Sequence, residues 1–363
     1  MNDLDYMRIA LNLAQSVKGQ TSPNPPVGSV IVKDGRIVGM GAHLKAGEGH
    51  AEVQAIKMAG THAENSTVYV TLEPCSHFGK TPPCANLLID HHVKRVVIAT
   101  KDPNPLVGGK GIERLRRAGI DVEVGILEKE ANELYDMFFY YISTKKPYVT
   151  LKTATTLDGK TATVSGSSKW ITGSEAREDV HKYRHLHDAI LVGVNTVIAD
   201  NPSLTTRLQA GGLHPIRIIL DHHLRTPLDA KVVTDQIAET WIVTLSNHSD
   251  EKKQAYINQG VKLIELESEK ITITDLLSKL GEHAITSILV EGGSEVNGSF
   301  LMEKAFNQVV TYIAPKLVGG REAPGFIGGE GIINMSDAHP LTFKSITQLG
   351  QDIKIISVPI EKG

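Results

Sequence analysis

The sequence predicts an α/β protein of two domains. In both halves, short β-branched runs alternate with segments of helical periodicity, which is the pattern of a sheet covered by helices. With 363 residues, the chain is long enough for two domains that each bury a core. Apolar residues recur at helical spacing within residues 128–142, and Lys145-Lys146-Pro147 then ends that run. We therefore place the boundary between domains 1–146 and 147–363.

The net charge limits the classes of partner, and the cysteine content indicates the redox compartment. A formal net charge of −3 and a pI near 6.6 give no basic surface for nucleic acid. Only two cysteines occur, and both lie inside the motif described below, which suits a reducing compartment. The start, Met1-Asn2-Asp3-Leu4-Asp5, is acidic rather than an apolar signal, and no run has membrane-spanning length. We expect a cytoplasmic protein with no nucleic-acid and no membrane partner.

The first half should contain one sheet with helices on its faces. Residues 3–17 are apolar along one helical face, with Asp3 as the expected cap. Asp34-Gly35 predicts a hairpin between strands 27–33 and 36–40. The remaining elements are expected to be helices at 51–59, 83–91 and 110–118 and strands at 67–72 and 94–100.

The stretch from His50 to Cys84 carries the residues of a zinc site. Zinc that takes part in chemistry commonly has three imidazole or thiolate ligands and one open position, and His50, Cys75 and Cys84 supply that number. The metal would lower the pKa of a bound water from about 15.7 to about 7. Glu52 is placed to move protons as general acid/base without binding the metal. A His-x-Glu followed by Pro-Cys and a later Cys is the signature of zinc deaminases.

Local structure supports these assignments. Strand 67–72 should deliver Cys75 at its end, and Pro82-Pro83 should begin a helix with Cys84 in its first turn, where a thiolate is favoured. A closed structural zinc site, or two buried cysteines, would use similar residues. The ligands, the carboxylate and the helix starts together favour the catalytic interpretation.

The run Pro74-Cys75-Ser76-His77-Phe78-Gly79-Lys80-Thr81-Pro82-Pro83-Cys84 resembles the bifunctional deaminase/reductase family of riboflavin biosynthesis. General zinc deaminases space these cysteines as C-x-x-C, whereas this chain shares the longer loop of that family. Further matches at 21–25, at 102–105 and throughout the second half extend the resemblance over nearly the whole chain. It implies a cytidine-deaminase-like fold for residues 1–146, with substrate contacts at Asn24, His43, His77 and Lys80. An exposed cation such as Lys80 suits a substrate phosphate.

The second half should contain an interior sheet, because several strands are apolar on both faces. Helix 174–186 is expected to be capped by Ser174 or Thr172. The other elements are expected to be strands at 148–152, 189–193, 216–220, 241–244, 261–265, 287–290 and 308–313 and a helix at 295–304.

A glycine pair follows the strand at 287–290. Glu291-Gly292-Gly293-Ser294 leads into a helix, whose N-terminal N–H groups can hold a phosphate. The run is not G-x-G-x-x-G, and a tight turn would use the same glycines. The glycine-rich residues 319–331 are expected to form a surface loop.

The same resemblance covers residues 147–363 and implies a dihydrofolate-reductase-like domain that uses NADPH. Two arginines, Arg184 and Arg207, are suited to clamp a phosphate. The implied substrate contacts are Lys152, Ser168, Arg184, Leu204, Arg207 and Glu291. The implied cofactor contacts are Ala154, Trp170, Thr196, Asp200, His222, Gly293 and Ser294, with His222 standing where the family usually has serine.

The function that the resemblance implies has two steps. The first domain would deaminate 2,5-diamino-6-ribosylamino-4(3H)-pyrimidinone 5′-phosphate with Zn²⁺, and the second would reduce the ribosyl side chain to ribityl with NADPH, in a homo-oligomer. A zinc deaminase of nucleic acid with a carboxy-terminal binding domain needs a cationic groove and stacking aromatics, and neither is visible at 5% aromatic residues. A non-catalytic zinc scaffold would bind metal without releasing an amine.

Overall fold

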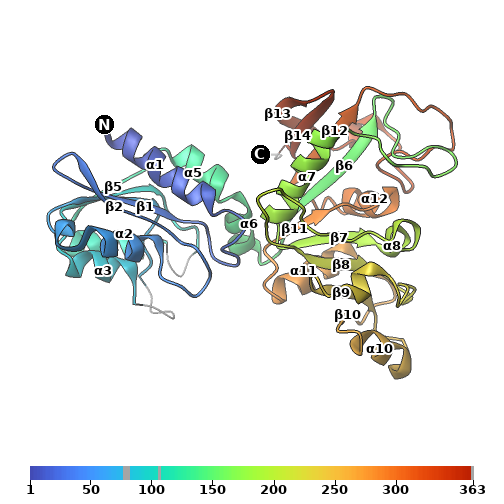
Figure 1. Cartoon of the computed structure of the whole chain (residues 1–363), viewed down its shortest axis with the longest axis horizontal. Helices are drawn as coiled ribbons and strands as arrows, with labels where there is room; N and C mark the ends of the chain where they lie inside the picture. Colours follow the sequence, from blue (N-terminus) through green and yellow to red (C-terminus); the bar gives the residue numbers. More distant parts are fainter. Residues whose placement is uncertain (77–81, 105–107, 361–363) are drawn as a thin grey trace. The chain divides into compact units, whose positions relative to one another are not determined.

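Each half of the chain forms its own sheet (Figure 1). The computed structural model describes residues 1–76, 82–104 and 108–360. Its backbone divides into two units, Met1–Lys145 and Lys146–Gly363. In the described ranges, no helix is long and apolar enough to cross a membrane.

The first unit is built on a five-stranded sheet in the order β2-β1-β3-β4-β5. β1 runs antiparallel to β2 and β3, whereas β3, β4 and β5 are parallel. The strands are β1 (Gly28–Lys33), β2 (Arg36–Ala42), β3 (Thr67–Leu72), β4 (Arg95–Thr100) and β5 (Asp121–Val124). The helices are α1 (Asp3–Ser16), α2 (Ala51–Ala59), η1 (Gly60–Ala63), α3 (Cys84–Asp90), α4 (Lys110–Arg117), α5 (Glu128–Leu134) and α6 (Asp136–Thr144).

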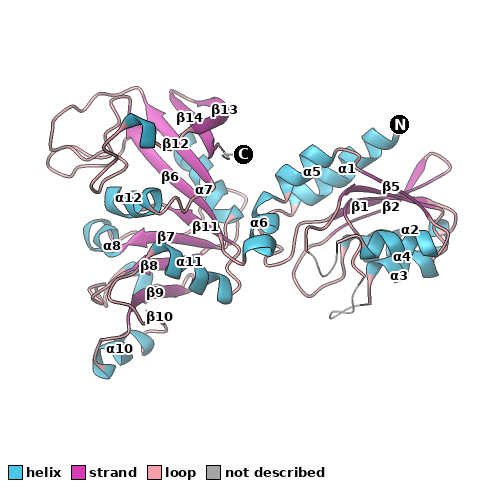
Figure 2. Cartoon of the chain, turned by 180° about the vertical axis from the view of Figure 1, so that it is seen from behind, coloured by secondary structure: helices cyan, strands magenta, loops and turns pink. Residues whose placement is uncertain are grey.

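Helices cover both faces of this sheet because alternate strand residues are apolar on each side. Val68, Val70 and their neighbours pack against α2, α3 and α4, whereas Tyr69 and Val97 pack against α1 and α5. Figure 2 shows the two groups of helices on opposite sides of the sheet. β2 leads to the segment around His50, and β3 leads to Cys75. Both segments therefore lie at the same edge of the sheet, beside α2 and α3.

Two sequence expectations for this unit are wrong. Asn2, not Asp3, caps α1, because its side chain accepts the N–H of Asp5 in a capping box. Asp3 instead pairs with Arg95 at 2.8 Å. The single helix expected at 128–142 is two helices, since Tyr135 leaves helical geometry (φ −96°, ψ 8°) and buries its ring, with its hydroxyl on Thr71. Strand β5 was not expected.

The second unit has a nine-stranded sheet in the order β10-β9-β8-β7-β11-β6-β12-β14-β13. β10 to β12 are parallel along this order, and β14 and β13 add an antiparallel edge. The strands are β6 (Tyr148–Thr156), β7 (Ala189–Gly193), β8 (Ile216–Leu220), β9 (Thr240–Leu245), β10 (Lys262–Leu266), β11 (Ser287–Val290), β12 (Gln308–Ala314), β13 (Leu341–Leu349) and β14 (Asp352–Pro359). The helices are α7 (Ser174–Leu186), α8 (Val194–Asp200), α9 (Lys231–Thr234), α10 (Asp250–Ile257), α11 (Ile273–Glu282), α12 (Ser294–Met302) and η2 (Met335–Asp337).

The strand order reverses near the middle of this sheet. From β6 the chain crosses to β7 and continues outward to β10, and it then returns to place β11 between β7 and β6. In open α/β sheets, ligands bind at such a switch point, outside the carboxyl ends of the strands. The loops after β6, β7, β8 and β11 meet at that edge.

Some features of the second unit differ from expectation. Gly173, not Ser174 or Thr172, is the N-cap of α7, and its N–H donates to Asp352 Oδ2 at 2.7 Å. That acceptor lies far along the chain, so local residue preferences did not reveal it. Helices α8 to α11 and the β13–β14 hairpin were not expected. Most side chains of β13 are exposed, so its residues show no clear apolar pattern from which a strand could be predicted.

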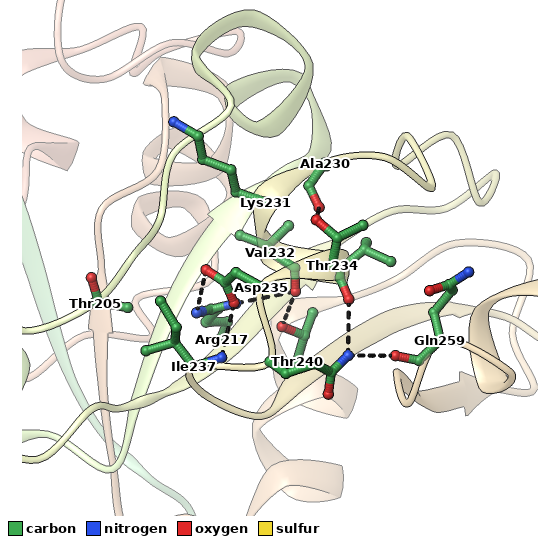
Figure 3. A network of polar contacts seen from close by, with 12 residues as sticks. Thr205, Arg217, Ala230, Lys231, Val232, Thr234, Asp235, Ile237, Thr240 and Gln259 are labelled. Atoms are coloured by element: carbon green, nitrogen blue, oxygen red, sulfur yellow. Dashed lines mark hydrogen bonds and ion pairs between the residues drawn. The ribbon is translucent and has the colours of Figure 1, made fainter.

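A buried ion pair anchors α9 against β8 (Figure 3). The Arg217 side chain is fully buried, and its guanidinium donates to both carboxylate oxygens of Asp235, at 2.7 and 3.0 Å, and to the carbonyl of Val232. Arg217 Nε has no hydrogen-bond partner among the described residues. Because one N–H of the buried Arg217 guanidinium is already unpaired, its charge depends strongly on Asp235 for compensation.

We expect Asp235→Ala to destabilise the second unit by about 3 kcal/mol, because it leaves the Arg217 charge buried without its partner. Both tryptophans, Trp170 and Trp241, lie in this unit, so tryptophan fluorescence of the full chain reports its unfolding. The double variant Arg217→Met/Asp235→Ala is the control and should recover part of the loss. An equal loss in both variants would contradict the role given to the ion pair.

Candidate active sites

The three predicted zinc ligands lie together in the first unit. His50 is the N-cap of α2, Cys84 begins α3, and Cys75 follows β3. His50 Nδ1 lies 3.6 Å from Cys75 Sγ and 3.3 Å from Cys84 Sγ, and the three donor atoms all fall within 4.8 Å of one another. Tetrahedral zinc, with bonds of about 2.3 Å to sulfur and about 2.0 Å to nitrogen, separates these atoms by roughly 3.5 Å. The donor set therefore fits zinc in chemistry and in spacing.

Glu52 lies beside this triad in the first turn of α2. Its side chain is buried, and Oε2 has no hydrogen-bond partner among the described residues. Burial, followed by the neighbouring Cys75, raises the pKa of its carboxyl to about 7. Gly41 lets α2 approach the sheet, because a Cβ there would meet the Ala51 carbonyl at 2.3 Å. The backbone thus places a carboxyl suited to proton transfer next to the metal ligands.

No role was expected for Glu73, which precedes Pro74-Cys75 and ties this segment to the start of α4. The buried Glu73 carboxylate accepts the N–H groups of Gly109 and Gly111 at 2.9 Å each, at the start of α4. Gly111 is needed there, since a Cβ would lie 2.1 Å from the Pro74 carbonyl. The signal in the sequence was an acidic residue directly before Pro74-Cys75. Its partners could not be found from local pattern.

Two of the four predicted deaminase substrate residues lie next to the triad. Asn24 Nδ2 donates to His43 Nε2 at 3.1 Å, and His43 Nδ1 donates to the Gly49 carbonyl at 3.4 Å, so one tautomer satisfies both contacts. The His43 ring packs edge-on against His50, with centroids 5.2 Å apart. Burial lowers the pKa of His43. His77 and Lys80 lie outside the described residues.

In the second unit, three predicted substrate residues form one charged cluster at the switch point. Arg184 of α7 donates to both oxygens of Glu291 at 2.7 and 3.0 Å, and Lys152 of β6 lies 3.6 Å from the same carboxylate. Burial alone would raise the pKa of Glu291, but Arg184 and Lys152 outweigh it and lower that pKa to about 2. The carboxylate is therefore charged at neutral pH and holds both cations in place.

The two arginines predicted as a phosphate clamp differ in their surroundings. The Arg184 guanidinium also donates to the Thr205 carbonyl at 3.0 Å, so it is engaged on several sides. Arg207 is exposed, and its guanidinium contacts Thr205 Oγ1 at 3.4 Å. Leu204, on the same loop, is buried with a left-handed φ of 51°. Arg207 is thus the more accessible of the two cations.

The predicted cofactor residues follow the carboxyl ends of neighbouring strands. Thr196 and Asp200 lie on α8 directly after β7, and Gly293 and Ser294 begin α12 after β11. No side chain caps α12, and a Cβ on Gly293 would meet nothing within 4 Å. The N–H groups at this helix start therefore fit a phosphate of a dinucleotide.

The remaining predicted cofactor residues lie around the same edge of the sheet, at the carboxyl ends of the strands. Ala154 lies two residues after Lys152 on β6. Trp170 is 65% exposed and lies in the loop between β6 and α7, which also carries the predicted substrate residue Ser168. The Arg177 guanidinium lies 4.7 Å from the centroid of the Trp170 ring. His222 follows β8, and its Nε2 accepts the Ile271 N–H at 3.3 Å. The His222 ring is therefore already engaged with the loop before α11.

Known proteins match both units. Residues 147–355 match the RibD C-terminal domain family, and residues 1–100 match the cytidine and deoxycytidylate deaminase zinc-binding region. The riboflavin biosynthesis protein RibD of Bacillus amyloliquefaciens is 52% identical over 98% of this chain and 95% of its own length. These matches confirm the predicted fold class, α/β with a cytidine-deaminase-like first domain and a reductase domain second.

Solved structures agree along the whole chain. Acinetobacter baumannii RibD is 40% identical with a TM-score of 0.91, covering 99% of each chain. A diaminohydroxyphosphoribosylaminopyrimidine deaminase/5-amino-6-(5-phosphoribosylamino)uracil reductase from Thermotoga maritima is 36% identical with a TM-score of 0.88, covering 98% of each. The chain therefore belongs to the RibD family of riboflavin biosynthesis proteins.

Proposed function

We propose that residues 1–146 deaminate 2,5-diamino-6-ribosylamino-4(3H)-pyrimidinone 5′-phosphate and that residues 147–363 reduce the ribosyl side chain of the product to ribityl. Family membership makes the chain a deaminase/reductase of riboflavin biosynthesis that uses Zn²⁺ and NADPH. The observation that carries the division of labour is that each unit holds a separate site. One has the His50, Cys75 and Cys84 donors, and the other has the cluster around Glu291.

In the deaminase unit, Glu52 is the proposed proton carrier. Bound zinc supplies a Lewis acid that activates water for attack on the pyrimidine ring. Glu52 would carry the two protons of that water in turn, the first to the ring nitrogen and the second to the amino group that leaves as ammonia. Burial excludes bulk water from this carboxyl, and its free Oε2 is available to the substrate. Asn24 and His43, which bond one another beside His50, would orient the pyrimidine.

In the reductase unit, the chain would bind and orient while NADPH supplies the hydride. Arg207 would contact the substrate phosphate, and Lys152 would face the ribosyl group from β6. Glu291 fixes Lys152 and Arg184 by charge, as their distances indicate. The start of α12 would hold the cofactor phosphates. We assign no protein base to the hydride step.

Two finer points complete the proposal. We place the enzyme in the cytoplasm, because both cysteines of the chain serve as metal donors and need reducing conditions. We also propose a homo-oligomer, in keeping with the family resemblance. The alternative of a nucleic-acid deaminase finds no support in a chain of net charge −3.

The test is to supply full-length protein with the diaminopyrimidine phosphate and follow ammonia release together with NADPH consumption. Both should occur, with ammonia release independent of NADPH. Residues 1–146 alone should release ammonia, and residues 147–363 alone should oxidise NADPH on the deaminated compound. Ammonia release without any NADPH consumption by the full chain would reject the second half of the proposal, and strand binding with a steep salt dependence would revive the nucleic-acid alternative.

A further inference from the structure

The loop at residues 201–215 joins α8 to β8 and carries Arg207. It forms neither helix nor strand, so its backbone must find partners elsewhere. Three of its N–H groups donate to histidine rings. Thr206 N–H donates to His214 Nδ1 at 3.2 Å, Arg207 N–H to His181 Nδ1 at 3.3 Å, and Leu213 N–H to His185 Nδ1 at 3.1 Å.

These contacts define the protonation state of the three histidine rings. A backbone N–H can only donate, so each Nδ1 must be an unprotonated acceptor and each ring must be neutral with its proton on Nε2. For His181, burial and then the cations Arg184 and Arg207 lower the pKa to about 4, while Glu291 and a hydrogen bond to the Thr205 backbone oppose this shift. The His181 acceptor is therefore present throughout the neutral pH range.

Helix α7 supplies the contacts nearest to Arg207. His181, Arg184 and His185 are three and four residues apart, so they share one face of α7. Arg184 donates to the Thr205 carbonyl, and His181 accepts the N–H of Arg207 itself. The peptide on each side of Thr206 is thus held by the same helix face.

Arg207 needs such an anchor because its side chain lies near a like charge. Partial burial of the guanidinium and then the neighbouring Arg184 lower the pKa of Arg207. Glu291 is already paired with Arg184 and Lys152 and leaves the local charge positive. Two guanidinium groups side by side suit a phosphate, but without one they repel, and an unanchored loop would carry Arg207 away.

We propose that His181 is a positioning residue of the reductase site, which holds Arg207 in place for the substrate phosphate by accepting its backbone N–H. This rests on the proposed function and deepens it. His181 acts through Arg207 and has no contact of its own with the substrate. Its loss should therefore weaken substrate binding and leave the hydride step unchanged.

The experiment compares His181→Leu with His181→Asn in the full-length protein. The Asn Oδ1 lies close to the position of a histidine Nδ1 and accepts the same N–H, whereas Leu cannot. His181→Leu should raise the KM for the deaminated pyrimidine phosphate about tenfold, the upper range for the loss of one hydrogen bond that holds Arg207 in place. The kcat and the KM for NADPH should stay near wild type, and His181→Asn should restore the substrate KM.

His185→Leu is the matched control, because it removes the same kind of hydrogen bond from the same helix but at Leu213. It should change the substrate KM by less than about threefold. Tryptophan fluorescence, which arises from Trp170 and Trp241 of the second unit, monitors the integrity of each variant. Equal KM values for His181→Leu and wild type, or equal effects of His181→Leu and His185→Leu, would overturn the proposal.

A second measurement separates this proposal from the proposed function. Hydrogen–deuterium exchange without substrate should be faster in the peptide containing Arg207 in His181→Leu, and unchanged in His181→Asn. If wild-type protein consumed no NADPH on the deaminated substrate, the proposed function would fail whatever the exchange showed. If wild type were active and exchange at Arg207 were the same in all variants, the role of His181 would be rejected and the proposed function would stand.

Discussion

Glu52→Gln should reduce ammonia release by about 10²- to 10⁴-fold, the range that a general acid/base contributes. The amide has nearly the shape of the carboxyl but cannot take the proton from water. Glu52 lies outside the zinc donor set, so zinc content should remain at the wild-type level. The measurement is ammonia release from the diaminopyrimidine phosphate, together with the zinc content of the purified variant.

The controls for this variant come from the chain itself. Glu48→Gln changes an exposed carboxyl four residues earlier and should leave ammonia release near wild type. NADPH oxidation on already deaminated substrate should be unaffected by either change, because it occurs in the other unit. Ammonia release by Glu52→Gln at the wild-type rate would show that another group carries the proton.

Removal of zinc should stop deamination completely while the reductase step continues. The donors His50, Cys75 and Cys84 all belong to the first unit, and the described residues offer no second group of this kind. Treatment with a chelator should therefore abolish ammonia release, and added Zn²⁺ should restore it. NADPH oxidation on deaminated substrate should proceed at the same rate throughout.

Tryptophan fluorescence provides the folding control for the chelation experiment, since Trp170 and Trp241 both report on the second unit. An unchanged spectrum with lost NADPH oxidation would mean that the two sites are not independent. Loss of ammonia release that Zn²⁺ fails to restore would point to damage of the thiolates rather than to removal of the metal.

The comparison of sequence with structure separates two kinds of information. Local periodicity predicted most strands of both units and most helices of the first, because burial of alternate or every third to fourth residue is a short-range property, but it missed α8 to α11. The zinc donors were predicted for the same reason. His50 and Cys84 stand at helix starts, and Cys75 stands just after a strand, so each position was marked by its own neighbours.

The tertiary structure decided which distant groups meet. Glu73 bonds amides at the start of α4, Arg184 is engaged by Glu291, and His181 accepts an N–H from Arg207. In each case the partner lies on another element, and only the strand order and helix packing bring the two together.

The sequence by itself therefore determined the α/β class, and it predicted two domains, three metal donors and a proton carrier. It did not determine how Arg207 is held or why Tyr135 interrupts a helix, since those depend on the tertiary environment. The physical reason is that propensity and periodicity act over a few residues, whereas a hydrogen bond or ion pair is chosen by whichever groups the folded chain buries side by side.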